Sequence, residues 1–470
     1  GTVVDGMWKP DFSQVESDDF QPTANNQFAL LFPEKRPFFL ESKNLLSTPL
    51  QAIYTRSIGE PRWGARLTQQ LDGANYTLLA SRDRGGGGLI EPGLLSSSVV
   101  EQPGESTATL GRFQSFAGDW RIGGLFTYRK YQDDSHNLVA GPDILWTPSS
   151  SDRVRAQYLV SATRNPERPD LYAGWLGQSL HDHAAYLDWS HVTDTWNWDT
   201  TYQHLGRDFR AWEGFMPQVD IVEYDGSLGY GFYPASNGWI NNLTPQLLLT
   251  RTDDDQGNLV LRSFAPSLAV NGAQSSTLQL NWYPDDRQLT PAGLVHLRYS
   301  TLSFSSNPNA HFTYFSTSLR LGEDVDYLTG DKGHGPQFRV KLQVYPVDRL
   351  ELDLVDSYQY LNAQTPLSGN LRLFSERGTQ LRALWFFTSR VYTELSAERD
   401  VIHRNLANYA SPVNHTERNS LYTLLFAYEP TPWTHFYAGY RKSDAQTLNQ
   451  PLFDGNQTQV FVKMAYEFAM

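Results

Sequence analysis

The sequence contains no cysteine, which excludes disulfides, thiolate metal sites, iron–sulfur clusters and cysteine nucleophiles. It also lacks long apolar runs, and none approaches the ~18 residues that a membrane-spanning helix needs. Charged residues are scarce, at 19%, against roughly 25% in an average soluble domain. The formal net charge is −13 and basic clusters are missing, so nucleic acid is not an expected partner.

The sequence does have an alternation of apolar and polar residues with a period of two, repeated from about residue 50 to the end. Successive side chains of a strand point to opposite faces, so each alternating segment predicts a strand with one apolar and one polar face. The last segment shows the pattern most clearly, with one face formed by Val460, Val462, Met464, Tyr466 and Phe468.

Three features favour a transmembrane barrel over a soluble sandwich. Many alternating runs reach about 10–16 residues, which suits the ~9–11 tilted residues that cross a bilayer. Aromatic residues such as Trp146, Trp282 and Trp385 gather at the ends of these runs, as in interfacial belts. Connections alternate between tight turns, such as Asp72-Gly73, and long polar loops, such as 84–105.

The predicted fold is therefore all-β: a large antiparallel transmembrane β-barrel in the bacterial outer membrane. A sheet facing lipid must close, because the bilayer offers no partners for unpaired backbone groups. Residues 50–470 form the barrel, and Gly1–Lys9 with one preceding strand would raise the total to 24 strands. The expected 22 strand centres lie near residues 53, 66, 78, 111, 125, 142, 158, 188, 202, 226, 245, 263, 278, 298, 315, 340, 355, 380, 396, 422, 438 and 463.

The polar face of such a barrel lines its lumen. Charges of both signs lie there, so strong selectivity for cations or anions is not expected. A lumen enclosed by ~22 strands is wider than that of porins, in a range where barrels carry a plug. We therefore expect part of the chain, or a partner, to fill it. The candidate lumenal residues are Arg339, Lys341, Glu351 and Asp353.

Residues 1–49 differ from the rest, because alternation is lost after a first strand-like segment. Pro33 and Pro37 make the segment that contains them a poor strand. One interpretation folds this segment into the lumen, and the other leaves it as a periplasmic or surface loop. In the first case, lumenal charges would pair with Glu34, Lys35, Arg36 and Glu41.

Three blocks in this part of the chain carry a resemblance: PDFSQVE (10–16), FPEKRPFFLE (32–41) and YTRSIGEPRWGARL (54–67). Together they resemble an uncharacterised bacterial outer-membrane family. Its members commonly carry a periplasmic carbohydrate-binding, family-nine-like domain ahead of a C-terminal barrel. The resemblance implies an outer-membrane location without an established activity. This chain departs from the family by lacking the upstream domain, through which a carbohydrate link would come.

The alternating C-terminal segment predicts recognition by the outer-membrane assembly machinery, through Tyr466 and Phe468. The other interpretation is an ordinary edge strand. In the loop 165–181, Tyr172 and Trp175 could stack on sugar rings or pack on neighbouring loops. An acidic loop, 322–331, is either a calcium site or a solvated loop. We expect no cofactor and no metal.

Three functions remain open. The favoured one is passage, or gated passage, of a polar solute, for which carbohydrate is a candidate. The second is a structural sheath or anchor for a periplasmic or surface protein partner. The third is an outer-membrane hydrolase using His415 and Ser420, but these positions differ in parity and would face opposite sides of a strand. We therefore expect no enzymatic activity, and outer-membrane lipid as the barrel's surroundings.

Overall fold

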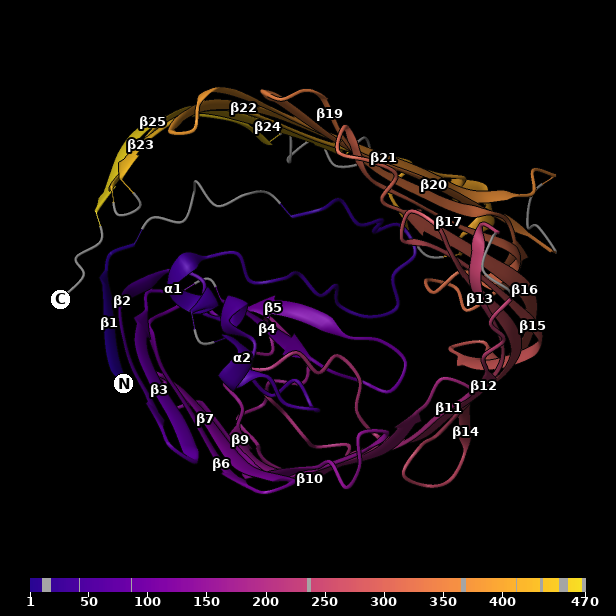
Figure 1. Ribbon diagram of the computed structural model, residues 1–470, viewed down its shortest axis with the longest axis horizontal. Helices are drawn as coiled ribbons and strands as arrows, with labels where there is room; N and C mark the ends of the chain where they lie inside the picture. Colours follow the sequence, from indigo (N-terminus) through magenta and orange to yellow (C-terminus); the bar gives the residue numbers. More distant parts are fainter. Residues whose placement is uncertain are drawn as a thin grey trace. The chain divides into compact units, whose positions relative to one another are not determined.

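The computed structural model (Figure 1) divides into two compact units, which are described separately. The N-terminal unit comprises residues 1–18, 27–230 and 248–263, and the C-terminal unit comprises 19–26, 231–247 and 264–470. The structure describes the whole chain except residues 11–17, 42, 86, 235–237, 365–368, 411, 432–433, 448–454 and 467–470.

Antiparallel strands joined in chain order build the N-terminal unit. β1 pairs with β2, β2 with β3 and β3 with β6, and each later strand pairs with the next as far as β12. β4 and β5 form a separate hairpin. The strands are β1 (Thr2–Trp8), β2 (Pro61–Leu71), β3 (Ala74–Asp83), β4 (Gly88–Glu91), β5 (Ser98–Glu101), β6 (Ser106–Ala117), β7 (Trp120–Tyr131), β8 (His136–Trp146), β9 (Asp152–Arg164), β10 (Ser179–Val192), β11 (Trp196–Leu205) and β12 (Ile221–Tyr230).

The C-terminal unit continues the same plan, and β13 (Ile240–Asp253) and β14 (Leu259–Gly272) contribute residues to both units. Its strands pair antiparallel in chain order from β15 to β25, and short β18 lies beside β17 and β20. They are β15 (Ser276–Thr290), β16 (Gly293–Ser306), β17 (Phe312–Val325), β18 (Lys332–His334), β19 (Gln337–Val347), β20 (Leu350–Ala363), β21 (Arg372–Thr388), β22 (Val391–Arg404), β23 (Thr416–Thr431), β24 (Thr434–Thr447) and β25 (Gly455–Tyr466).

Helical structure is limited to single turns. These are α1 (Pro37–Leu40), α2 (Lys43–Leu46), η1 (Thr55–Ser57) and η2 (Leu406–Asn408). In the described part of the chain, no helix has the length and apolar character needed to span a membrane.

The structure confirms the predicted antiparallel all-β fold. The described residues form 25 strands, of which β4, β5 and β18 are short, and the other 22 have at least seven residues. Alternate apolar side chains point away from the protein interior: Val460, Val462 and Met464 of β25 are 76%, 83% and 65% exposed. This exposed apolar face is what a lipid-facing sheet requires.

One predicted strand is wrong. Residues near 53 lead into the turn η1, and the neighbouring strand β2 begins only at Pro61. Ala52, Thr55 and Ile58 are all buried, so this segment is covered on more than one side and does not separate an exposed face from a buried one. The predicted long loop 84–105 also differs, because it contains the hairpin of β4 and β5.

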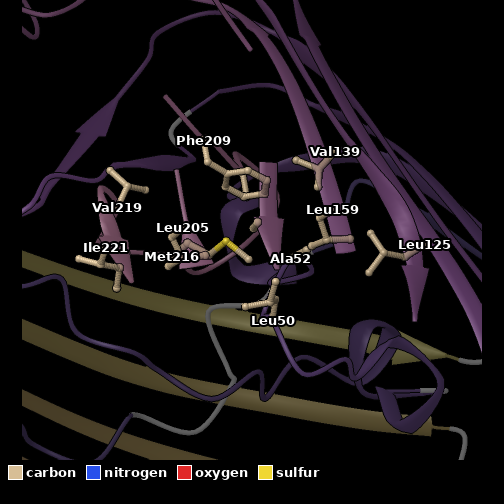
Figure 2. Packing of buried hydrophobic residues seen from close by; sticks show 12 residues of the cluster. Leu50, Ala52, Leu125, Val139, Leu159, Leu205, Phe209, Met216, Val219 and Ile221 are labelled. Carbon is tan, nitrogen blue, oxygen red and sulfur yellow. The ribbon is translucent and has the colours of Figure 1, made fainter. Parts of the chain in front are cut away.

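The inner face of the N-terminal unit is partly apolar rather than uniformly polar. Leu125, Val139 and Leu159 point inward from the sheet and are buried. Figure 2 shows them packed with Leu50 and Phe209, which come from segments that cross the concave side of the sheet. Burying one such side chain contributes about 1.5–3 kcal/mol. These segments are therefore bound to the sheet by an apolar core.

Candidate functional site

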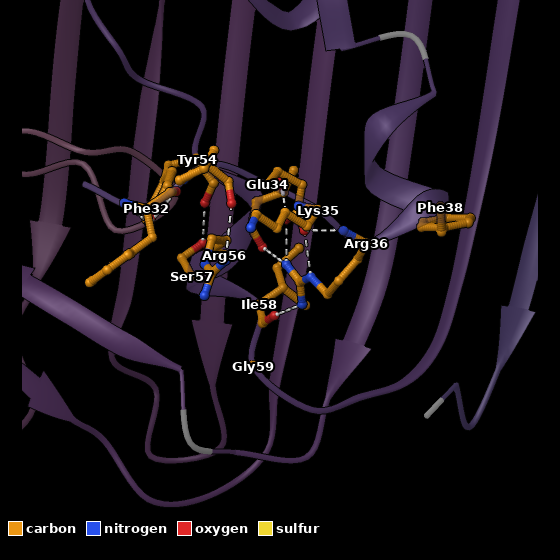
Figure 3. A network of polar contacts seen from close by, with 12 residues as sticks. Phe32, Glu34, Lys35, Arg36, Phe38, Tyr54, Arg56, Ser57, Ile58 and Gly59 are labelled. Carbon is orange, nitrogen blue, oxygen red and sulfur yellow. Dashed lines mark hydrogen bonds and ion pairs between the residues drawn. The ribbon is translucent and has the colours of Figure 1, made fainter. Parts of the chain in front are cut away.

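A clamp of charged groups joins two of the sequence blocks in the N-terminal unit (Figure 3). The Arg36 guanidinium donates to Glu34 Oε1 at 2.8 Å, to the Ile58 carbonyl at 2.6 Å and to the Thr55 carbonyl at 2.7 Å. Burial alone would raise the pKa of Glu34, but the hydrogen bonds and charge of Arg36 outweigh it and hold that pKa below its usual value. Glu34 and Arg36 therefore form an ion pair with each other.

Arg66 is the point where the N-terminal segment meets the sheet. It extends inward from β2 and donates to Asp5 at 2.6 Å and to the Phe38 carbonyl at 2.5 Å. Its guanidinium also forms an ion pair with Glu41. Lys35 lies beside this clamp, half-buried, and its backbone N–H donates to Glu34. Glu41 therefore contacts a charge of a sheet strand, Arg66 of β2.

A fully buried ion cluster surrounds Arg129 of β7. Its guanidinium lies 3.0 Å from Asp83 of β3 and 3.2 Å from Glu213, and it donates to the Ser57 carbonyl at 2.9 Å. The Ser57 hydroxyl donates to Glu213 at 2.7 Å. Burial raises the pKa of Glu213, and the charge of Arg129 opposes this effect. No local sequence pattern indicates this cluster, because its members come from four separate segments.

In the C-terminal unit, residues 19–26 cross the inner face of the sheet, and we call this segment the strap. The backbone N–H groups of Thr23 and Ala24 donate to Glu376 of β21, at 2.7 and 3.3 Å. The Phe20 ring packs directly on Gly378, and a side chain at position 378 would occupy the space that the ring fills. The strap is therefore held by backbone hydrogen bonds to a carboxylate and by one aromatic ring.

The predicted lumenal residues of β19 and β20 share the inner face of the C-terminal unit. Arg339 Nη1 donates to the Phe20 carbonyl at 2.7 Å, and Lys341 Nζ lies 2.6 Å from Asp19. Glu351 accepts a hydrogen bond from Gln343 at 2.9 Å, and Asp353 lies 3.4 Å from Arg382. The structure thus brings two of the four, Arg339 and Lys341, into contact with the strap.

The two predicted sugar-stacking residues have different environments. Trp175 is fully buried, and its indole N–H donates to Glu91 at 2.9 Å. The Tyr172 ring packs edge-on against it, with the ring centroids 6.1 Å apart. No face of the Trp175 indole is left for a sugar, because its ring holds the loop 165–181 against β4. Tyr172 remains partly exposed.

Two further predictions concern the C-terminal strands. Tyr466 ends β25 and pairs in register with Thr434, whereas Phe468 lies outside the described residues. The candidate hydrolase residues are separated along β23: the five residues from Thr416 to Ser420 span ~13 Å of extended chain. His415 contacts the Thr416 hydroxyl at 3.0 Å. Among the described residues, no group of three or more His, Asp or Glu side chains could hold a metal ion.

Comparison with known proteins gives matches in solved structures only. No family model and no curated protein matches the chain. The siderophore receptor PirA from Pseudomonas aeruginosa is similar, with a TM-score of 0.49 and 10% identity over 89% of this chain and 78% of that one. The FrpB iron transporter from Neisseria meningitidis is similar with a TM-score of 0.44 and 10% identity, over 86% of this chain and 70% of that one. The copper transporter OprC is similar with a TM-score of 0.43 and 11% identity, over 86% of this chain and 68% of that one.

The chain's own structure decides its class. Long antiparallel strands pair in chain order within each unit, with an exposed apolar face and an inner face that carries the ion pairs. This division of the two faces is that of a barrel surrounded by lipid. The protein is a bacterial outer-membrane β-barrel.

Proposed function

We propose that this barrel passes a polar solute, or gates its passage, and that residues 19–26 and 50–58 act as inward-folded plug segments, each within its own unit. The strap is the observation that carries this proposal. It lies on the inner face through contacts with Glu376, Arg339 and Lys341. Hydrogen bonds to charged groups contribute about 1.5–3 kcal/mol each, so a few of them hold a segment that a competing polar group can release.

The two parts of the proposed plug differ in how firmly they are held. Residues 50–58 pack into an apolar core and meet the buried Arg129 cluster. Polar contacts carry most of the strap's attachment, and Phe20 is its one large buried apolar side chain. We therefore assign the movable role to the strap and a fixed role to residues 50–58. Carbohydrate is the solute class that we propose.

Electrical recording in planar bilayers tests the proposal. The wild-type chain is compared with Glu376→Ala, which removes the acceptor for the N–H groups of Thr23 and Ala24. Arg377→Ala is the matched control, because Arg377 is the next residue of β21 and forms an exposed ion pair with Asp356 on the outer face. We expect Glu376→Ala to spend a larger fraction of time open, and Arg377→Ala to resemble wild type.

Folding of each variant is checked by its heat-dependent migration on gels. If neither the wild-type chain nor Glu376→Ala conducts ions, in bilayers where a reference porin does, the transport proposal fails. That result would favour the structural role as a sheath or anchor for a partner.

A further inference from the structure

The inner face of the C-terminal unit carries a depression of about 280 Å³ over β16 and β17. Four serines and two threonines belong to its lining, together with a tyrosine and an arginine. The lining includes Ser303, Ser305, Ser316, Ser318, Tyr314 and Arg339.

Strand register explains why the sheet is hollow at this place. Opposed residues on neighbouring strands have Cβ atoms ~4.5–5.5 Å apart, so the four serines form one contiguous patch of short side chains. Longer side chains bound the patch on both sides. Two rows cross β15, β16, β17 and β19: Gln279, Ser303, Ser318 and Arg339 in one, and Thr277, Ser305, Ser316 and Lys341 in the other.

The polar groups of this depression are available to a ligand. In the described part of the chain, none of the four serine hydroxyls makes a hydrogen bond to a protein group, and the same holds for the Tyr314 hydroxyl. Each hydroxyl can both donate and accept. An array of such groups beside an aromatic ring matches a sugar, whose hydroxyls need both roles and whose C–H face packs on an aromatic surface.

The charges at the edge of the depression indicate the charge of its ligand. Arg339 and Lys341 border one side, and no carboxylate belongs to the lining within the described residues. Both cations already hold oxygen atoms of the strap: Lys341 the Asp19 carboxylate at 2.6 Å, and Arg339 the Phe20 carbonyl at 2.7 Å. A carboxylate on the ligand would find the same two cations, and a guanidinium can bind it through two hydrogen bonds.

We propose that this depression is a binding site for an acidic saccharide, meaning a sugar that carries a carboxylate. The ring hydroxyls bond to the four serines, the ring face lies on Tyr314, and the carboxylate pairs with Arg339 and Lys341. This inference rests on the proposed function and names its substrate class. Ligand and strap compete for the same cations, so binding of the solute weakens the attachment of the strap.

Calorimetry on the full chain in detergent micelles tests the site, with digalacturonate as the acidic saccharide, maltose as a neutral one and citrate as an acid that is not a sugar. We expect digalacturonate to bind most tightly. The double variant Ser316→Val/Ser318→Val should weaken it roughly tenfold or more, because two hydrogen-bonding hydroxyls are lost. Ser300→Val is the control, since Ser300 pairs with Trp282 and lies on the outer apolar face.

Three outcomes would overturn the assignment. If maltose binds as tightly as digalacturonate, the carboxylate has no role in binding. If citrate binds as tightly as digalacturonate, the sugar ring has no role. If the double serine variant binds digalacturonate as the wild type does, the site lies elsewhere. Hydrogen exchange of the strap amides tests the competition: exchange should rise when digalacturonate is added, and unchanged exchange in the bound protein contradicts it. Saccharide binding without bilayer conductance would contradict the transport proposal alone. Conductance without saccharide binding would contradict this inference alone.

Discussion

Lys341 and Asp19 are 322 positions apart in the chain, yet the Lys341 ammonium lies 2.6 Å from the Asp19 carboxylate. Both side chains are partly exposed, so this pair by itself contributes only about 0–1 kcal/mol. Its neighbour Arg339 adds a hydrogen bond to the Phe20 carbonyl. The strap is thus attached by several modest contacts that act together.

Removing both cations should loosen the strap. In Arg339→Gln/Lys341→Gln, we expect amide hydrogen exchange of residues 19–26 to rise roughly tenfold or more, because a charge-assisted bond is lost together with an ion pair. Exchange in peptides from residues 50–58 should not change. Arg377→Gln serves as the control on the outer face, and a strap that exchanges equally slowly in all three proteins would show that these cations do not hold it.

Arg129 and Lys130 are adjacent on β7, but substitution should lower stability at Arg129 only. Arg129→Met leaves Asp83 and Glu213 buried without their cation, which we expect to lower stability by about 3–5 kcal/mol. Lys130→Met removes an exposed pair with Asp134 and should leave stability unchanged. The measurement is the unfolding temperature in detergent, followed on gels. Equal effects of the two substitutions would contradict the burial of the Arg129 cluster.

A charge placed on successive positions of β15 tests which face meets lipid. Leu280 belongs to the exposed apolar face, whereas Gln279 belongs to the inner face. Leu280→Arg should destabilise the barrel by about 2–4 kcal/mol if it lies near the bilayer midplane, and Gln279→Arg should fold normally. The readout is the fraction of chain that folds into lipid vesicles at increasing urea. Tolerance of arginine at residue 280 with rejection at 279 would reverse the assignment of the faces.

The Glu34–Arg36 clamp should weaken in acid. The folded-state pKa of Glu34 is lowered, because Arg36 outweighs the effect of burial. A group with a lowered pKa stabilises the fold fully above its unfolded-state value and loses that contribution as the pH falls through the folded one. We therefore expect Glu34→Gln to expose residues 32–58 to protease at pH 7, with the difference from wild type shrinking well below pH 4.5, the ordinary value for Glu. A difference that stays constant down to pH 3 would contradict this assignment.

Most strands could be predicted because lipid and solvent impose a period of two on any strand that separates them. Phe338 and Arg339 illustrate this: one is exposed on the outer face, and the other reaches the strap on the inner face. The failure near residue 53 has the same physical origin. Ala52 and Ile58 have protein packed around them, so the environment along this segment does not alternate between apolar and polar. The hydropathy pattern therefore cannot predict its backbone conformation.

The inner contacts could not be predicted, because they depend on which distant segments meet. Glu213 reaches Arg129 from 84 positions away, and Glu376 reaches Thr23 from 353. Composition offered Trp175 as a candidate for sugar stacking, but its hydrogen bond to Glu91 makes it part of the loop's internal packing. The patch of four serines also becomes visible only when the register of β16 and β17 is known, because that register pairs Ser303 with Ser318 and Ser305 with Ser316.

The position of Arg129 couples the inner segments to the sheet. Its buried guanidinium pairs with Asp83 of β3 and with Glu213, and it donates to the Ser57 carbonyl. Displacing the segments that carry Ser57 and Glu213 would leave this cation with one of its two carboxylates, and breaking a buried ion pair is strongly destabilising. A charge of the sheet thus resists the removal of the segments that cover it.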